Sequence, residues 1–214
     1  MAKYPVFLEL DSRRVVLVGG GAVAVRKATV LLEAGARLVV VTDRAVDVLT
    51  NLCTQHGAEL IRAKYDKQYL GEAALVIAAT NDEKVNAQVY HDCQTLGILC
   101  NVVDDPQHCD FFVPAVVKRG DLQIAIGTEG NCPAYAGHLR KKLERMFTEQ
   151  HGQFLAELEQ MRRWIIEDVP GPDDRKAILG RLVDDESLEF FVAQGPAAWR
   201  KRAQDTIQSH LAKS

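Results

Sequence analysis

The sequence is poor in cysteine, and its cysteines are not paired. Five cysteines are scattered along 214 residues without a C-x-x-C spacing, which argues against a structural zinc site and a disulfide framework. No apolar run approaches the roughly 18 residues of a membrane span, and Pro5 and Glu9 interrupt any export signal at the start. We therefore expect a cytoplasmic protein in a reducing compartment, with no membrane association.

A strong net charge is also lacking. The formal net charge is -3, and acidic and basic residues are intermixed rather than gathered in blocks. This balance gives no reason to expect nucleic acid as a partner. No internal repeat or low-complexity segment is visible. The length suits one domain of about 100 to 150 residues with a smaller addition.

The first hundred residues alternate between short apolar runs and helical patterns. Near-continuous apolar runs are typical of parallel strands covered on both faces. Such runs occupy residues 13–20, 36–43, 58–64, 73–80 and 97–104. The segments between them have helical periodicity, and Gly35, Gly57 and Gly97 lie where those helices should end. The alternation predicts an α/β fold with a doubly wound parallel sheet.

The pattern changes after residue 110. Residues 111–130 predict two β segments around the turn at 118–121. From Pro133 onward nearly everything is helical, with a break at 170–174. We therefore expect a small α+β segment followed by a helical C-terminal domain.

A glycine-rich turn joins the first predicted strand to the first helix. In VVLVGGGAVAVRK, Gly19, Gly21 and Ala24 form a G-x-G-x-x-A pattern. The first glycine permits a tight turn, the second allows a pyrophosphate to approach the backbone, and the small third residue lets helix and strand pack closely. The stretch Gly19, Gly20, Gly21, Ala22 and Val23 is thus predicted to bind a dinucleotide at the helix N-terminus. The alternative is a tight turn without a ligand.

The end of the second strand bears on the choice of cofactor. Asp43 is placed to accept hydrogen bonds from the adenosine ribose, which favours NAD. Arg44 beside it keeps NADP possible, since an arginine there can pair with a 2′-phosphate.

Other strand ends should line the same crevice, because ligands of open α/β sheets lie outside the carboxyl ends of the strands. The predicted lining is Thr80, Asn81, Asn101, Val102 and Asp104. Asp104 would lie near the nicotinamide and could accept a proton while a hydride leaves. The alternative for Asp104 and Asp105 is a solvated strand end before Pro106.

The stretch NVVDDPQHCDFFVP, residues 101–114, is dense in carboxylate, imidazole and thiol groups. It could be a metal site, an acid/base site or a solvated loop. Its ligand types have no familiar metal-binding spacing, so we expect no resident metal. The interpretation we prefer is one proton-handling aspartate, Asp104, with the other residues shaping the turn.

Several motifs together resemble the precorrin-2 dehydrogenases, the siroheme synthase dehydrogenase/ferrochelatase family. They are YPVFLEL (4–10), the glycine-rich stretch (15–36), IAATND with a following VN (77–86), NVVDDP (101–106), F-x-PAVVKRGDLQIAI (112–126) and CPAYAGHLRKKLE (132–144).

The resemblance implies oxidation of precorrin-2, a tetrapyrrole, to sirohydrochlorin with NAD as cofactor. In some members the same cleft also inserts Fe²⁺. It further implies that Asp104 is the acid/base residue and that the protein is a homodimer. The implied division is a Rossmann domain (1–112), a dimerisation segment (113–150) and a helical domain (151–214). The methyltransferase domain that some members carry has no room in 214 residues, so we expect methylation to come from another protein.

Substrate contacts are also carried over from the resemblance. They are predicted at Thr128, Asn131, Pro133 and Arg140, and Arg140 could meet substrate carboxylates together with Lys118, Arg119 and Lys141. The chain departs from the family pattern at Glu129, which adds a negative charge, and at Gly137, where the family has an arginine.

Two classes of function stay open at this point. One is the dehydrogenase, with or without the chelatase step. The other is a non-catalytic NAD-sensing module, which would need the glycine turn but has no reason to keep the motifs of residues 101–144.

Overall fold

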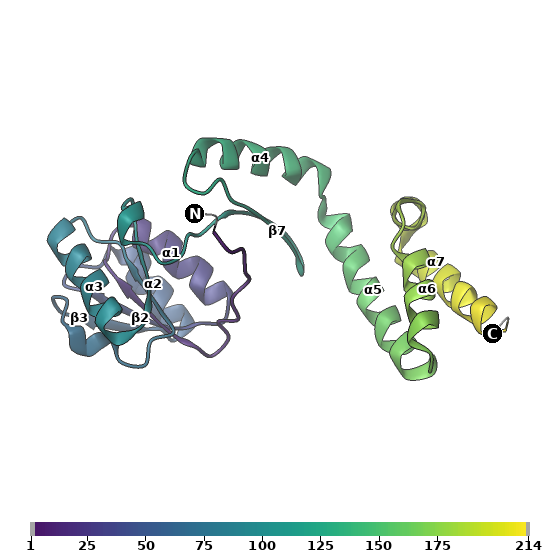
Figure 1. Cartoon of the computed structure of the whole chain (residues 1–214), viewed down its shortest axis with the longest axis horizontal. Coiled ribbons are helices and arrows are strands. Elements are labelled where there is room, and N and C mark those ends of the chain that lie inside the picture. Colours follow the sequence, from purple (N-terminus) through teal and green to yellow (C-terminus); the bar gives the residue numbers. More distant parts are fainter. Residues whose placement is uncertain (1–2, 213–214) are drawn as a thin grey trace. The chain divides into compact units, whose positions relative to one another are not determined.

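The computed structural model describes residues 3–212. The chain divides into two compact units, with the boundary between Val113 and Pro114 (Figure 1). The division of the second unit into a dimerisation segment and a helical domain stays a prediction.

The first unit contains a five-stranded parallel sheet. Its strands are β1 (Arg14–Val18), β2 (Arg37–Thr42), β3 (Glu59–Arg62), β4 (Leu75–Ala78) and β5 (Leu99–Val102). Each lies inside one of the predicted apolar runs. Their spatial order is β3-β2-β1-β4-β5, so the winding reverses between β1 and β4. The predicted doubly wound fold is confirmed, and this reversal is where such sheets bind ligands.

Successive residues of a strand face opposite sides of the sheet. Their side chains therefore form two separate cores, one on each face. Val15 and Leu17 pack with α1 (Ala22–Glu33) and α2 (Asp47–His56). Val16 and Val18 pack on the other side with the short 3-10 helix η1 (Lys67–Leu70) and α3 (Glu83–Leu96). Burial on both faces explains why the strands are almost continuously apolar.

Local signals set the ends of the helices. Gly57 and Gly97 follow α2 and α3 in the left-handed conformation, at φ 66° and 68°, which glycine adopts without steric cost. The carboxylate of Asp82 begins α3 by accepting from the backbone N–H groups of Lys84 at 2.9 Å and Val85 at 3.3 Å.

The second unit begins with a hairpin of β6 (Ala115–Arg119) and β7 (Leu122–Ile126). The helices α4 (Pro133–Met146) and α5 (Glu149–Asp168) follow. The sequence predicted one uninterrupted helical stretch here, and the structure corrects this. The chain breaks at Phe147–Thr148, where a capping box between Thr148 and His151 starts a new helix.

The end of the second unit is a small helical bundle. Helices α6 (Pro172–Leu182) and α7 (Asp185–Leu211) pack with α5 around Trp199 and Phe154. The indole N–H of Trp199 donates to the Ser187 hydroxyl at 2.8 Å, which satisfies this buried polar atom. Gly195, at φ 82°, kinks α7 just before Pro196.

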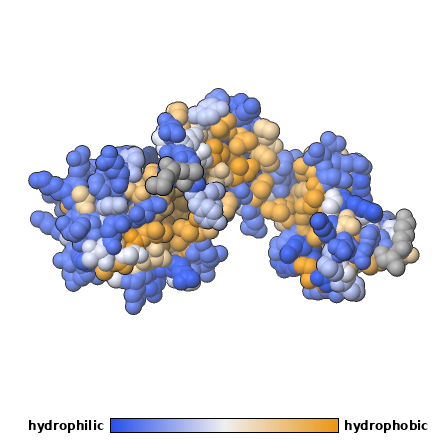
Figure 2. Space-filling view, viewed as in Figure 1, coloured by the Kyte–Doolittle hydropathy of each residue, from blue (hydrophilic) through white to orange (hydrophobic). Residues whose placement is uncertain are grey.

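Some large apolar side chains remain at the surface of both units. They include Tyr4 and Phe7 in the first unit and Tyr135 and Met146 in the second, and Figure 2 shows apolar residues reaching the surface in each. Within residues 3–212, no helix combines the length and the apolarity needed to cross a bilayer.

Candidate functional site

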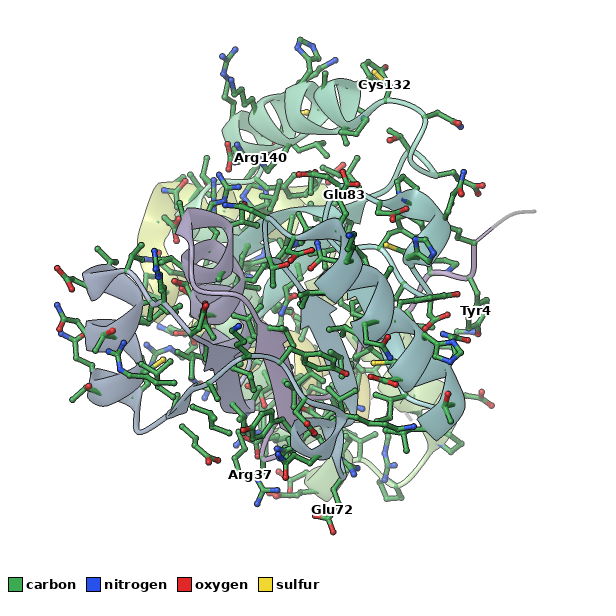
Figure 3. The ribbon with its side chains drawn as sticks, turned by 90° about the vertical axis from the view of Figure 1, so that its left-hand side faces the viewer. Tyr4, Arg37, Glu72, Glu83, Cys132 and Arg140 are labelled. Carbon is green, nitrogen blue, oxygen red and sulfur yellow. The ribbon has the colours of Figure 1, made fainter. Side chains whose placement is uncertain are left out.

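A cavity of about 1000 Å³ lies at the carboxyl ends of the strands. Figure 3 helps to locate it: Arg37 and Glu72, which precede or begin strands, mark one end of the unit, and Glu83, the first residue of α3, marks the other. Ten of the predicted residues line the cavity: Gly19, Gly20, Gly21, Ala22, Val23, Asp43, Arg44, Thr80, Asn81 and Asp104. The fold thus gathers residues from the ends of β1, β2, β4 and β5 around one space.

Two of the three glycines are required by close backbone contacts. Gly19 has φ 131°, and a Cβ there would lie 2.4 Å from the carbonyl oxygen of Ala79. A Cβ on Gly20 would lie 1.9 Å from the carbonyl oxygen of Arg44. Both distances are far below van der Waals contact, so these positions exclude any side chain for reasons of folding alone.

Gly21 is different. Its φ is -90°, which any residue can adopt, and a Cβ there would meet no protein atom within 4 Å. Gly21 is the N-cap of α1, and it caps the helix without a side-chain hydrogen bond. The first N–H groups of α1 are therefore available to an anion, and the first turn of α1 contains no acidic residue to repel one. This fits the phosphates of a dinucleotide.

Asp43 and Arg44 lie side by side at the exposed end of β2. The hydroxyl of Thr42 holds this turn by donating to the carbonyl of Arg44 at 2.9 Å. The cavity therefore presents both a carboxylate and a cation at this point, so the residues on which the NAD and the NADP predictions depend both line it.

The side chain of Asn86 holds the loop after β4 by hydrogen bonds. Its side-chain amide donates to the carbonyl of Thr80 at 3.0 Å, and its Oδ1 lies 2.7 Å from the hydroxyl of Thr80. Because Asn86 is buried, these bonds hold Thr80 and Asn81 firmly at the cavity edge.

Asp104 is exposed to the cavity from a strained turn. Its φ is 62°, in the left-handed region that aspartate adopts more readily than most residues. The N–H of Asp105 closes the turn on the carbonyl of Val102 at 3.3 Å. Lys27 is near enough to interact with Asp104: burial lowers the pKa of Lys27, and the negative charge of Asp104 acts in the opposite direction.

The four titratable residues from Asp105 to Asp110 are held by hydrogen bonds to neighbouring groups. Asp105 accepts from Nδ1 of His108 at 2.6 Å, and this pairing lowers the pKa of the Asp105 carboxyl. The Cys109 thiol donates to the carbonyls of Val102 and Asp105, both at 3.2 Å. Asp110 accepts from the backbone N–H of Cys100 at 2.8 Å.

The stretch 101–114 therefore presents one carboxylate, Asp104, to the cavity. Throughout residues 3–212, no three His, Cys, Asp or Glu side chains gather as metal ligands would.

Asn101 and Val102 do not line the cavity, contrary to the sequence-based prediction. Both lie within β5, where the sheet covers them. The Asn101 amide donates to the carbonyl of Phe111 at 2.9 Å and to the Cys109 sulfur at 3.3 Å, and Val102 belongs to the core. The crevice begins one residue later, where the chain leaves the sheet.

The predicted substrate residues lie in the second unit, in the turn before α4 and along this helix. The N–H of Asn131 donates to the carbonyl of Thr128 at 2.9 Å, and Pro133 is the first residue of α4. Arg140 pairs with Glu144 one turn along α4. Substrate contact at these four residues stays a prediction.

Arg119, by contrast, has a structural role. Its guanidinium donates to the carbonyls of Phe147 at 2.8 Å and Glu144 at 3.0 Å, at the C-terminus of α4. It also forms an ion pair with Glu149 at 3.3 Å. With a third bond from Nη1 to the Lys118 carbonyl, three of the five guanidinium N–H groups are used, and the side chain is held at the end of α4.

Sequence reasoning missed part of the cavity wall. The structure adds Ala63, Lys64 and Tyr65 after β3, and Lys84, Val85 and Gln88 on α3. The rule on strand ends, applied to β3, would have found the first three. The α3 residues had no signal in the sequence.

Comparisons with known proteins agree with this architecture. Residues 6–115 match the family model described as putative NAD(P)-binding, and residues 119–146 match the model described as sirohaem biosynthesis protein central.

The chain is 36% identical over 203 residues to siroheme synthase 1 of Aeromonas salmonicida, covering 95% of this chain and 43% of that protein. It is also 36% identical over 208 residues to the siroheme synthase of Pseudomonas aeruginosa, with coverages of 97% and 44%. It thus spans less than half the length of these relatives.

Among solved structures, the chain resembles SirC, precorrin-2 dehydrogenase, with a TM-score of 0.78 and 24% identity over 95% of this chain and 100% of that one. This likeness establishes the shared fold. The resemblance indicated by the sequence motifs is confirmed by these relatives. The NAD(P)-binding match covers more than half of the sequence, and the chain therefore belongs to the putative NAD(P)-binding family.

Proposed function

We propose that the chain catalyses the NAD-dependent oxidation of precorrin-2 to sirohydrochlorin. The observation that carries the proposal is a single cavity that joins the free N–H groups of α1, behind Gly21, to the carboxylate of Asp104. The siroheme enzymes among the relatives supply the substrate class.

In this proposal the residues of the chain bind the cofactor and move one proton. The N-terminus of α1 stabilises the phosphates, and Asp43 binds the adenosine ribose. When bound, NAD⁺ supplies the acceptor for a hydride. The carboxylate of Asp104 accepts the proton that the tetrapyrrole must lose for the two-electron oxidation to balance.

The cofactor preference and the wider setting are part of the same proposal. We expect NAD rather than NADP because Asp43 would repel a 2′-phosphate, in spite of Arg44. We further propose a homodimer in the cytoplasm, which is what the family resemblance of the sequence motifs implies. A single-subunit mass in analytical ultracentrifugation would contradict the dimer.

The first experiment is turnover by the purified chain. With NAD⁺ and precorrin-2, sirohydrochlorin absorbance should appear, and Asp104→Asn should slow kcat by about 100-fold or more, the usual contribution of a general base. Asp105→Asn is the matched control, because Asp105 pairs with His108 and does not line the cavity. Equal values of kcat for wild type and Asp104→Asn would contradict the proposed role of Asp104 as the general base.

The alternative of an NAD-sensing module gives a different result: NADH would bind, but precorrin-2 would not be oxidised. The cofactor preference is tested in the same assay, and equal turnover with NADP⁺ at equal concentration would contradict it. Insertion of Fe²⁺ is a separate step, measured as loss of sirohydrochlorin above the uncatalysed rate when Fe²⁺ is added without NAD⁺.

A further inference from the structure

A buried carboxylate lies behind the wall of the cavity. Asp92, on α3, is only 6% exposed. Its Oδ2 accepts from the hydroxyl of Tyr65 at 2.9 Å, and its Oδ1 accepts from the side-chain amide of Gln88 at 3.1 Å. The ammonium of Lys67 lies 4.0 Å from Oδ1. Asp92 itself does not line the cavity, but Tyr65 and Gln88 do.

These partners come from separate parts of the chain. Tyr65 follows β3, and Gln88 lies in the second turn of α3. Asp92 therefore joins two elements that form one wall. Burial, together with the bond to Asp92, raises the pKa of the Tyr65 hydroxyl well above its usual range, so the hydroxyl stays a donor.

The wall has a defined place relative to the rest of the site. In the strand order β3-β2-β1-β4-β5, the end of β3 lies on the same side of β1 as Asp43, and Asp104 lies on the other side. Tyr65 also packs into the core on the face opposite α1. With the phosphates at the N-terminus of α1 and the ribose at Asp43, the wall is on the adenosine side of the cavity.

Stability alone is a poor explanation for this carboxylate. A buried ion must recover a large desolvation cost, and well-packed apolar residues in its place often give equal or greater stability. A hydrogen-bonded buried carboxylate does, however, define the orientation of the donors around it.

We propose that Asp92 is a positioning residue that holds the ring of Tyr65 and the amide of Gln88 as the wall against which the adenosine end of the cofactor binds. The inference rests on the proposed function, since it assumes a dinucleotide in the cavity. Asp92 acts through its two partners and does not touch the ligand.

The test uses ligands that represent the two ends of the dinucleotide. Isothermal titration of the full chain with ADP-ribose should show that Asp92→Asn raises Kd about tenfold, equivalent to about 1.4 kcal/mol. The Kd of nicotinamide mononucleotide, measured by competition, should change less than about twofold in the same variant, because distant sites behave independently. A merely structural defect would weaken both ligands alike, and that outcome would overturn the proposal.

A second variant keeps the test independent of the folding of Asp92→Asn. Tyr65→Phe keeps the ring and removes only the hydroxyl, and it should also weaken ADP-ribose. The double variant Tyr65→Phe/Asp92→Asn should raise the Kd of ADP-ribose no more than Asp92→Asn alone, because both changes break the same bond. The matched control is Tyr69→Phe: Tyr69 packs in the same core but does not line the cavity, so its affinity should equal that of wild type.

Failure of this inference can be told apart from failure of the proposed function. If wild type binds ADP-ribose and both Tyr65→Phe and Asp92→Asn bind it equally well, only the role of Asp92 is overturned. If wild type binds ADP-ribose but oxidises no precorrin-2, the proposed reaction is overturned. The role of Asp92 is then still decided by the Kd values of the variants for ADP-ribose. If wild type binds no dinucleotide, both are overturned.

Discussion

Replacing Gly21 by alanine should separate cofactor binding from folding. The added methyl would meet no protein atom within 4 Å, and φ of -90° suits alanine. Reduced freedom of the unfolded chain should stabilise by about 0.4 to 1 kcal/mol. Loss of glycine at an N-cap should cost about 0.5 to 1 kcal/mol. These effects offset each other, so the free energy of unfolding should change by less than about 1 kcal/mol.

The binding of NADH should change much more. If a phosphate approaches the backbone at Gly21, the methyl displaces it from the N–H groups of α1. Loss of a hydrogen bond to a charged group costs about 1.5 to 3 kcal/mol, which corresponds to a rise in Kd of about 10- to 100-fold. NADH fluorescence titration and thermal denaturation of the same samples measure both quantities.

Two variants calibrate this result. Gly20→Ala should destabilise by about 3 kcal/mol or more, because its methyl would lie 1.9 Å from a carbonyl oxygen. Gly180→Ala, within α6 and with no atom within 4 Å of its added methyl, should stabilise by up to about 1 kcal/mol and leave binding unchanged. Normal NADH affinity in Gly21→Ala would refute the placement of the phosphates.

Two further predictions concern side-chain bonds that stabilise the fold. The pKa of Asp105 is lowered by His108, so the stabilisation from this pair is present above the ordinary carboxyl pKa of about 3.9 and is lost as pH falls below it. Carboxyl NMR titration should show the pKa of Asp105 rising in His108→Asn, and an unchanged value would contradict the pairing. Arg119→Met should destabilise the second unit by about 1 to 3 kcal/mol in urea denaturation, because carbonyl groups at the end of α4 lose their donors. Lys118→Met, at an exposed neighbour, is its control, and equal effects of the two changes would argue against the structural role of Arg119.

The parts of the site that the sequence predicted well depend on local geometry. The glycine turn follows from the steric demands of one strand-to-helix connection, where a Cβ on Gly19 or Gly20 would lie 2.4 Å or 1.9 Å from a carbonyl oxygen. Asp43 directly follows β2 and Asp104 lies two residues after the end of β5. Both line the cavity, because parallel strands end at one edge of the sheet.

Predictions failed where the outcome depended on how far a local pattern extends. The apolar pattern around β5 runs to residue 104, but the strand ends at Val102. Asn101 and Val102 therefore lie within the sheet and do not line the cavity, which begins at Val103. The helical pattern runs through Phe147–Thr148, yet a cap formed by Thr148 and His151 divides it. Periodicity reports an average over many residues and does not locate such boundaries.

By itself, the sequence determined the parallel sheet, the glycine turn at the N-terminus of α1 and the candidate base Asp104, because period, turn chemistry and strand ends are local properties. Only the tertiary structure decided which polar residues serve the cavity and which serve the fold. Asp92 accepts hydrogen bonds from Tyr65 and Gln88, which both line the cavity, and Arg119 donates to the carbonyl of Phe147 at the end of α4. Those roles depend on contacts between residues distant in sequence, which no local pattern encodes.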